Sequence, residues 1–314
     1  MGDQAKSAGG LEARLKSGRF VLTAETSPPD AAALEPVLAR AACLKGLVDA
    51  VNVTDGAGAK AHMSALAAAA ILARAGIEPV LQLTARDRNR MALQADMLGA
   101  AALGVPNLLC LKGDDPAKGD QPETKPVFDL DGRGLIETAR LLRDEGRFPS
   151  GRKIEPAPRF LIGATDAPVE PGAGWKPVAL AAKIEAGADF VQTQFCFDMG
   201  LLRRYLAALG DHGLAARVPI LVGIGPLASG RAARWMREKL PGVQLPEALV
   251  DRLERAADPA AEGRRICAEL LEELAEIEGV AGAHLMAPGR EAAIAETLQI
   301  AAFRDRPRAA AGGI

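Results

Sequence analysis

Eight short apolar segments recur along the chain, and each is followed by a longer segment whose Ala and Leu content is typical of a helix. The apolar segments are rich in Val, Ile, Leu and Phe, and we predict that all eight are strands. They lie at residues 20–25, 48–54, 79–84, 107–112, 159–165, 189–195, 219–225 and 282–287. Strands that are apolar almost throughout and alternate with helices indicate a parallel sheet covered by helices. Eight such units favour an α/β fold of the (β/α)8 TIM-barrel type over an open sheet.

Two connections between these units are longer than the others. Residues 113–130 are predicted to form a surface loop, and residues 240–278 are predicted to form extra helices before the last strand. A TIM barrel commonly occupies about 250 residues or more as one domain, so we expect the 314 residues to form a single domain, residues 1–314. The segments 1–18 and 305–314 are expected to be flexible termini.

The composition excludes several classes of function. The formal net charge is −2 and aromatic residues make up only 4% of the chain, so nucleic acid is not an expected partner. The first 20 residues lack the continuous apolar core of a signal peptide, and no stretch of about 20 residues is free of charge, so we expect no membrane association and a cytoplasmic location. The four cysteines lie far apart without a CxxC pair, and no metal site is predicted.

Polar side chains gather where the predicted strands end. In a TIM barrel the active site forms at the carboxyl ends of the strands, where the loops converge on one mouth. Polar groups buried there need a partner or a ligand, although strand caps account for some of them. The residues in question are Glu25, Thr54, Asp55, Gln82, Thr84, Lys112, Asp114, Thr165, Asp166, Gln192 and Gln194.

A single acid, Glu25, ends the first strand in the stretch VLTAETSPP, residues 21–29. Burial disfavours the charged form of a carboxyl group. An acid at this position would therefore keep a proton available near neutral pH. The alternative is that Glu25 is a strand cap held by a salt bridge.

Several strand ends, taken together and in order, resemble the methylenetetrahydrofolate reductase family, and most closely its acetogen-type bacterial branch. The matching stretches are AETSPP (24–29), VNVTDGAGA (51–59), LQLTARDRNR (81–90), LCLKGDDP (109–116), KPVFDLD (125–131), GADFVQTQFCFD (187–198), PILVGIGPL (219–227) and AGAHLMAPGRE (281–291). The resemblance implies a flavin enzyme on an eight-stranded barrel. Its reaction would be hydride transfer from reduced FAD that interconverts 5,10-methylenetetrahydrofolate and 5-methyltetrahydrofolate, with NAD(P)H or another electron donor reducing the flavin. Tetrahydrofolate derivatives are thus the implied partners, and a homo-oligomer is expected by analogy.

The resemblance assigns catalytic roles to Glu25 and Asp114. Glu25 would supply the proton that opens the five-membered ring of the substrate, so that the bridging carbon becomes an electrophilic iminium. Asp114, in KGDDP, would favour this cation and bind the pterin. A turn role is the alternative for Asp114, because Asp and Pro are common turn residues.

The resemblance also implies residues that bind the substrate and the flavin. Gln194 would contact the pterin through its amide, and Arg290 lies in the last matching stretch. Gln192 is the weaker candidate, on the expectation that it points to the other face of the strand. Besides Asp114, the residues implied for the flavin are Thr54, Gln82, Thr84, Asp87, Lys112, Gly113 and Lys183.

Alternative roles and functions stay open at this point. Asp87 could instead cap the following helix, and His284 in the last strand has the pattern of a buried core residue. Many members of the family carry histidine in place of Gln82. The chain could also be a flavin-free folate reductase, a pterin-binding methyltransferase, or a folate-binding subunit without redox chemistry. Glu25 argues against methyl transfer, because that reaction has no ring-opening step.

Overall fold

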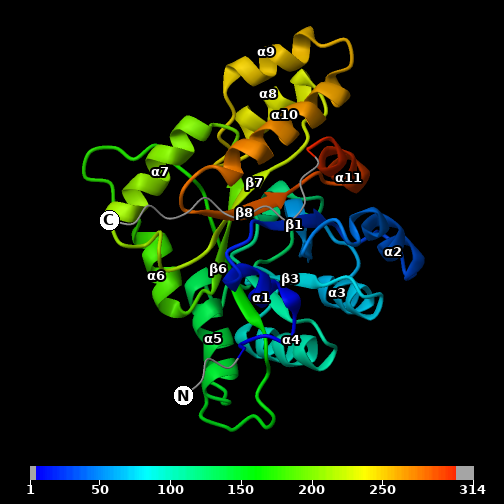
Figure 1. Ribbon diagram of the computed structural model, residues 1–314. Coiled ribbons are helices and arrows are strands. Elements are labelled where there is room, and N and C mark those ends of the chain that lie inside the picture. Colours follow the sequence, from blue (N-terminus) through cyan, green and yellow to red (C-terminus); the bar gives the residue numbers. More distant parts are fainter. Residues whose placement is uncertain (1–4, 302–314) are drawn as a thin grey trace.

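Eight parallel strands close into a barrel in a computed structural model that describes residues 5–301 (Figure 1). Each strand pairs with its neighbours in sequence order, and β8 pairs with β1 to complete the ring. The predicted TIM-barrel fold is therefore confirmed. The strands are β1 (Val21–Thr26), β2 (Ala50–Val53), β3 (Pro79–Thr84), β4 (Asn107–Leu111), β5 (Leu161–Asp166), β6 (Phe190–Phe195), β7 (Ile220–Ile224) and β8 (Val280–Leu285).

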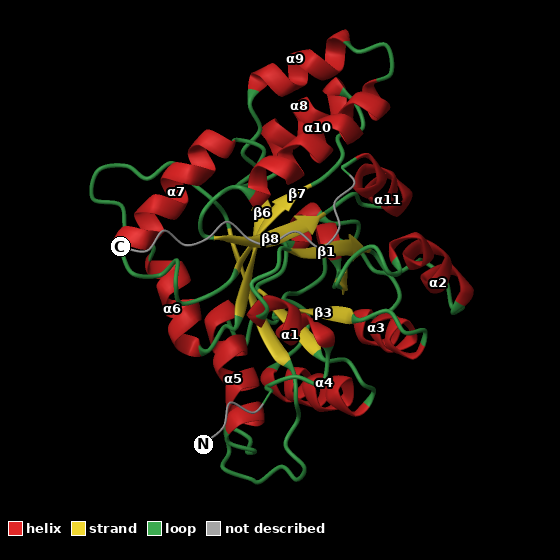
Figure 2. Cartoon of the chain, in the orientation of Figure 1, coloured by secondary structure: helices red, strands yellow, loops and turns green. Residues whose placement is uncertain are grey.

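Helices surround this barrel and bury the outward faces of its strands (Figure 2). Short apolar runs become strands here because both of their faces are covered, one by the helices and one by the barrel interior. The α-helices are α1 (Gly10–Lys16), α2 (Glu35–Ala41), α3 (Ala65–Arg74), α4 (Arg90–Ala102), α5 (Gly132–Asp144), α6 (Val178–Ala186), α7 (Met199–Asp211), α8 (Gly230–Lys239), α9 (Glu247–Arg255), α10 (Pro259–Ala275) and α11 (Glu291–Ile300). Three short 3₁₀ helices are η1 (Ala42–Leu44), η2 (Ala57–Ala59) and η3 (Pro116–Lys118).

The two long connections also follow the prediction. Residues 113–130 form a loop that contains only η3, and the segment before β8 contains the extra helices α9 and α10. In Figure 1, α8, α9 and α10 lie together on one side of the barrel. Among residues 5–301, no helix is long and apolar enough to cross a membrane.

The expectation of a flexible terminus is wrong for part of segment 1–18. Residues 10–16 form α1, whose Leu11 and Leu15 are buried against the residues that begin the strands, so α1 closes the amino-terminal end of the barrel. The carboxylate of Glu78 accepts hydrogen bonds from the backbone N–H groups of Gly10 and Leu11, which would otherwise lack partners at a helix start. Segment 305–314 lies outside the described residues.

The barrel interior changes character from one end to the other. Near α1 it is apolar, with Val21, Val80, Leu161, Phe190 and Leu221 packed together. Toward the carboxyl ends of the strands the interior positions become polar. Closing the apolar end with α1 leaves the polar end as the opening of the barrel.

Candidate active site

A cavity of about 570 Å³ opens at the carboxyl ends of the strands. Its volume lies within the range typical of small-molecule sites. Ten of the twelve residues that the resemblance assigned to the site line this cavity: Glu25, Thr54, Gln82, Thr84, Lys112, Gly113, Asp114, Lys183, Gln192 and Gln194. Three more of the expected strand-end residues, Asp55, Thr165 and Asp166, line it as well. Two predicted site residues, Asp87 and Arg290, do not line it.

Glu25 lies at the base of the cavity and is mostly buried, with 16% of its side chain exposed. Its Oε2 accepts a hydrogen bond of 3.0 Å from Nε2 of Gln82. The Nε2 atom of His284 lies 3.7 Å from the same oxygen. No Lys or Arg within residues 5–301 forms a salt bridge with Glu25, so the acid is held by an amide and an imidazole and not by a permanent cation.

A fully buried polar network lies beneath Glu25. Gln192 and Asn52 exchange two hydrogen bonds, of 2.6 and 3.1 Å. Gln192 Nε2 also donates to the hydroxyl of Thr23, at 3.0 Å. That hydroxyl lies 3.0 Å from Nδ1 of His284. Strands β1, β2, β6 and β8 each contribute one of these side chains.

The ring of His284 is held within this network. Its Nδ1 lies 3.0 Å from the Thr23 hydroxyl and 3.4 Å from Nε2 of Gln192, and its Nε2 faces Glu25. His284 is buried, as the sequence predicted. The sequence did not indicate that it adjoins the acid.

The expectation that Gln192 and Gln194 point to opposite faces of β6 is wrong. Residues two apart along a strand share a face, and both amides line the cavity. They differ in depth: Gln192 is fully buried in the network, whereas Gln194 is half-buried at the rim. The rim position makes Gln194 the amide that can meet a ligand directly.

Two adjacent aspartates after β4 have different partners. Asp114 accepts a hydrogen bond of 2.8 Å from the backbone N–H of Gly58, in the loop after β2, and it lines the cavity. Asp115 accepts from the N–H of Ala117 and caps η3. Asp115 therefore takes the turn role that was the alternative for Asp114.

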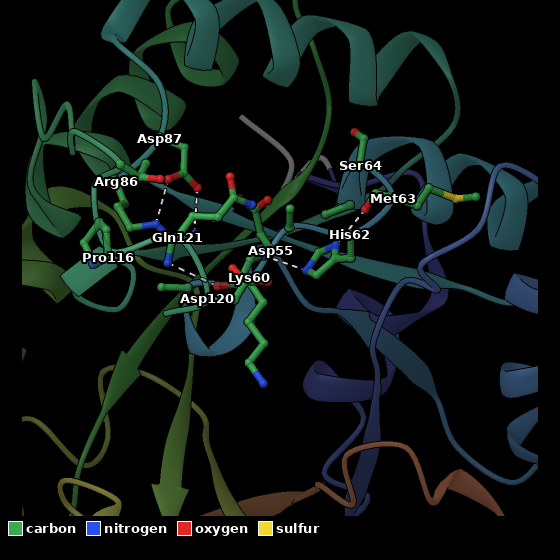
Figure 3. A pocket seen from close by; sticks show the side chains of 15 residues that line it. Asp55, Lys60, His62, Met63, Ser64, Arg86, Asp87, Pro116, Asp120 and Gln121 are labelled. Atoms are coloured by element: carbon green, nitrogen blue, oxygen red, sulfur yellow. Dashed lines mark hydrogen bonds and ion pairs between the residues drawn. The ribbon is translucent and has the colours of Figure 1, made fainter. Parts of the chain in front are cut away.

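Asp87 lies in a second, smaller cavity of about 300 Å³ between the loops that follow β2, β3 and β4 (Figure 3). Its carboxylate receives two hydrogen bonds of 2.7 Å from Arg86, and the hydrogen bonds from this guanidinium lower the pKa of Asp87. Arg86 also donates to the carbonyls of Gly56 and Asp114. The pair thus ties three loops together. The helix cap proposed for Asp87 is provided by Asn89.

Arg290 lies at the start of α11 and donates a hydrogen bond of 2.9 Å to the carbonyl of Pro226. It joins the loops after β7 and β8 beside the cavity. A further strand-end residue of the cavity, Asp166, accepts a hydrogen bond from the buried hydroxyl of Tyr205. Burial raises the pKa of Asp166.

The cavity lining fits a flavin, a planar cofactor whose ring can carry negative charge when reduced. Lys112 and Lys183 bring positive charge to it, and Lys112 Nζ also lies 5.5 Å from the centre of the Phe128 ring. Hydroxyl and amide groups come from Thr54, Thr84 and Gln82. The backbone at Gly113 has φ +94°, a conformation that other residues rarely adopt.

Comparison with known proteins gives one consistent family. The family model described as methylenetetrahydrofolate reductase matches residues 10–302. A Caenorhabditis elegans protein named probable methylenetetrahydrofolate reductase (NADPH) is 26% identical over 249 residues, which cover 76% of this chain and 34% of that protein. Methylenetetrahydrofolate reductase 2 of Schizosaccharomyces pombe is 26% identical over 218 residues, which cover 65% of this chain and 32% of that protein. The chain spans about a third of the length of these relatives.

Among solved structures, an uncharacterized protein from Clostridium thermocellum has the same fold. It matches with a TM-score of 0.65 and 14% identity, over 93% of this chain and 98% of that one. That structure is described as binding two copies of 5-methyl-5,6,7,8-tetrahydrofolic acid.

Proposed function

The chain belongs to the methylenetetrahydrofolate reductase family, and we propose that it interconverts 5,10-methylenetetrahydrofolate and 5-methyltetrahydrofolate by flavin-mediated hydride transfer. We further propose that residues 1–314 act as one reductase domain with NAD(P)H as the electron donor. The named relatives and the folate bound by the C. thermocellum protein support this reaction. The observation that carries it is the position of Glu25, an acid without a salt-bridge partner among Lys and Arg of residues 5–301, at the base of an open cavity.

Glu25 is the group that would hold the proton for ring opening. The reaction requires a proton at the nitrogen that leaves the bridging carbon, and a positioned carboxylic acid can deliver it. Within residues 5–301 no Lys or Arg pairs with Glu25, whose neighbours are the amide of Gln82 and the imidazole of His284.

Gln82 complements Glu25 in both protonation states. Its N–H donates to the ionised carboxylate at 3.0 Å, and after rotation of the amide its oxygen could accept from the protonated acid. The acid can therefore give up and recover a proton without losing this partner. The side chain that the sequence assigned to the flavin would also position the acid.

The remaining cavity residues would bind and orient the pterin ring of the substrate and the ring system of the flavin. Gln194 and Asp114 offer hydrogen-bonding groups to a pterin, and the negative charge of Asp114 would favour the cationic iminium. Lys112 and Lys183, with Thr54 and Thr84, would hold the flavin. When bound, a reduced flavin would supply the hydride.

The absorption spectrum of the purified protein, recorded with and without added FAD, tests the flavin assignment. A flavin spectrum that NAD(P)H bleaches and that 5,10-methylenetetrahydrofolate restores is expected. A colourless protein that converts folate with NAD(P)H would instead be a flavin-free reductase. A colourless protein that binds folate without redox chemistry would be a methyltransferase or a binding subunit.

Replacing Gln82 with Met is expected to slow the folate half-reaction by about 10²-fold, because loss of the amide lets Glu25 move from its position. Gln82→His is expected to retain more of the rate, since an imidazole can also donate to the acid. Rapid mixing of the reduced enzyme with the folate measures both variants. Equal rates in Gln82→Met and the unmodified protein would contradict the positioning role.

A further inference from the structure

The segment that joins α8 to α9 reaches the rim of the barrel. It runs beside the end of β6, where the N–H of Gln244 donates to the carbonyl of Phe195 at 3.0 Å. The carbonyl of Gln244 in turn accepts from the N–H of Phe197 at 2.6 Å. Val243 is buried, and Pro241 lines the main cavity. A segment outside the barrel strands thus forms part of the cavity wall.

The amide of Gln194 is fixed by two backbone groups. Its Oε1 accepts a hydrogen bond of 2.9 Å from the N–H of Phe195, and its Nε2 donates to the carbonyl of Pro241 at 3.3 Å. A backbone N–H can only donate and a carbonyl can only accept, so these contacts determine which end of the amide is oxygen. One N–H of Nε2 and one lone pair of Oε1 remain for a ligand.

We propose that the segment Pro241–Gln244 belongs to the substrate site and that Pro241 is a positioning residue for Gln194. By holding the amide in one orientation, Pro241 fixes the order of donor and acceptor that the cavity presents. The ligand that fits is a planar heterocycle with an acceptor and a donor side by side on one edge, which is the chemistry of a pterin. The proposal rests on the proposed function, and it gives the helices beyond β7 a role in substrate recognition.

Gly242 offers a way to displace this segment. Its φ is +78°, and an added Cβ would lie 3.1 Å from Cβ of Ala167 and 3.6 Å from Cγ of Gln194. The first distance is tighter than normal and the second is ordinary contact, so Gly242→Ala should shift the segment by a few tenths of an ångström and lengthen the 3.3 Å hydrogen bond between Gln194 and the Pro241 carbonyl. Gly279 is a matched control, because its φ is +86° and an added Cβ would meet no atom within 4 Å. Both substitutions place Ala at a positive φ, but only Gly242→Ala crowds a neighbouring side chain, that of Ala167.

The experiment compares the two variants by calorimetric titration with 5-methyltetrahydrofolate. Gly242→Ala is expected to raise the Kd about tenfold, while Gly279→Ala binds as the unmodified protein does. Affinity for FAD should be the same in all three. Equal folate affinity in the two variants would overturn the proposal.

A second measurement does not depend on folate. The side-chain amide signals of Gln194 in ¹⁵N NMR spectra, assigned by their loss in Gln194→Leu, should show slow hydrogen exchange in the unmodified protein and in Gly279→Ala. They should exchange faster in Gly242→Ala. Unchanged exchange in Gly242→Ala would overturn the role of Pro241 even if that variant no longer bound folate. Absence of folate binding to the unmodified protein would instead contradict the proposed function.

Discussion

Replacing Glu25 with Gln is expected to slow the transfer of hydride to 5,10-methylenetetrahydrofolate by about 10²–10⁴-fold, the usual contribution of a general acid. Gln has nearly the same size and can still accept the hydrogen bond from Gln82. It cannot hold the proton that ring opening requires. Reduction of the flavin by NAD(P)H involves no ring opening and should keep nearly its full rate.

Stopped-flow measurement of the two half-reactions separates these effects. Glu291 provides a control, because it is a buried carboxylate at the same end of the barrel whose Oε1 accepts a hydrogen bond from Thr26 and which does not line the cavity. Gln at this position can still accept that bond, so Glu291→Gln should leave both half-reactions close to normal. Equal losses in the two half-reactions of Glu25→Gln would reject the acid role.

The fold could be predicted from sequence because its determinants are local. Each apolar run such as PVLQLT, residues 79–84, identifies one strand, and eight of them in alternation with helices leave few architectures. The exception is α1. Nothing near residues 10–16 indicates where Leu11 and Leu15 pack, since the cluster that they join reaches Ala281, about 270 positions away.

The candidate site was predictable in part for the same reason. Glu25, Asp114 and Gln194 lie at or just after strand ends, which the barrel brings together, and the resemblance to the family then singled them out. The contact between Glu25 and His284 could not, because it joins the first and last strands. Asp87 and Arg290 lie within matching stretches, but their side chains bond within the loops and do not line the main cavity.

The polar layer beneath Glu25 links the fold to the proposed chemistry. Burying four polar side chains is costly unless every group finds a partner. Here Thr23, Asn52, Gln192 and His284 satisfy one another. The network fixes the position of the His284 imidazole beside Glu25. A role in positioning the acid would therefore explain why the barrel contains a buried polar layer.

A buried ion pair at the other end of β6 leads to the second large prediction. Arg143 of α5 donates to Asp189 at 2.5 Å, and their side chains are only 4% and 7% exposed. Asp189 also accepts from the N–H of Ile162 and from Lys6, while Arg143 donates to the carbonyl of Phe160. These contacts join α5 to the starts of β5 and β6, the strand that carries Gln192 and Gln194.

Arg143→Met is expected to lower the free energy of unfolding by about 3–5 kcal/mol, because removing one partner leaves the other charge buried without its main counterion. The loss should fall near the lower value, because Lys6 already pairs with Asp189 at 2.7 Å and remains as a second cation. Urea denaturation measures the change. Arg133→Met in the same helix is the control: its pair with Glu137 is exposed, and such pairs contribute about 0–1 kcal/mol. Adding Asp189→Asn to Arg143→Met should recover part of the loss, since the unpaired charge is then gone. A loss no larger than that of Arg133→Met would show that Asp189 is adequately stabilised by Lys6 and the Ile162 amide alone.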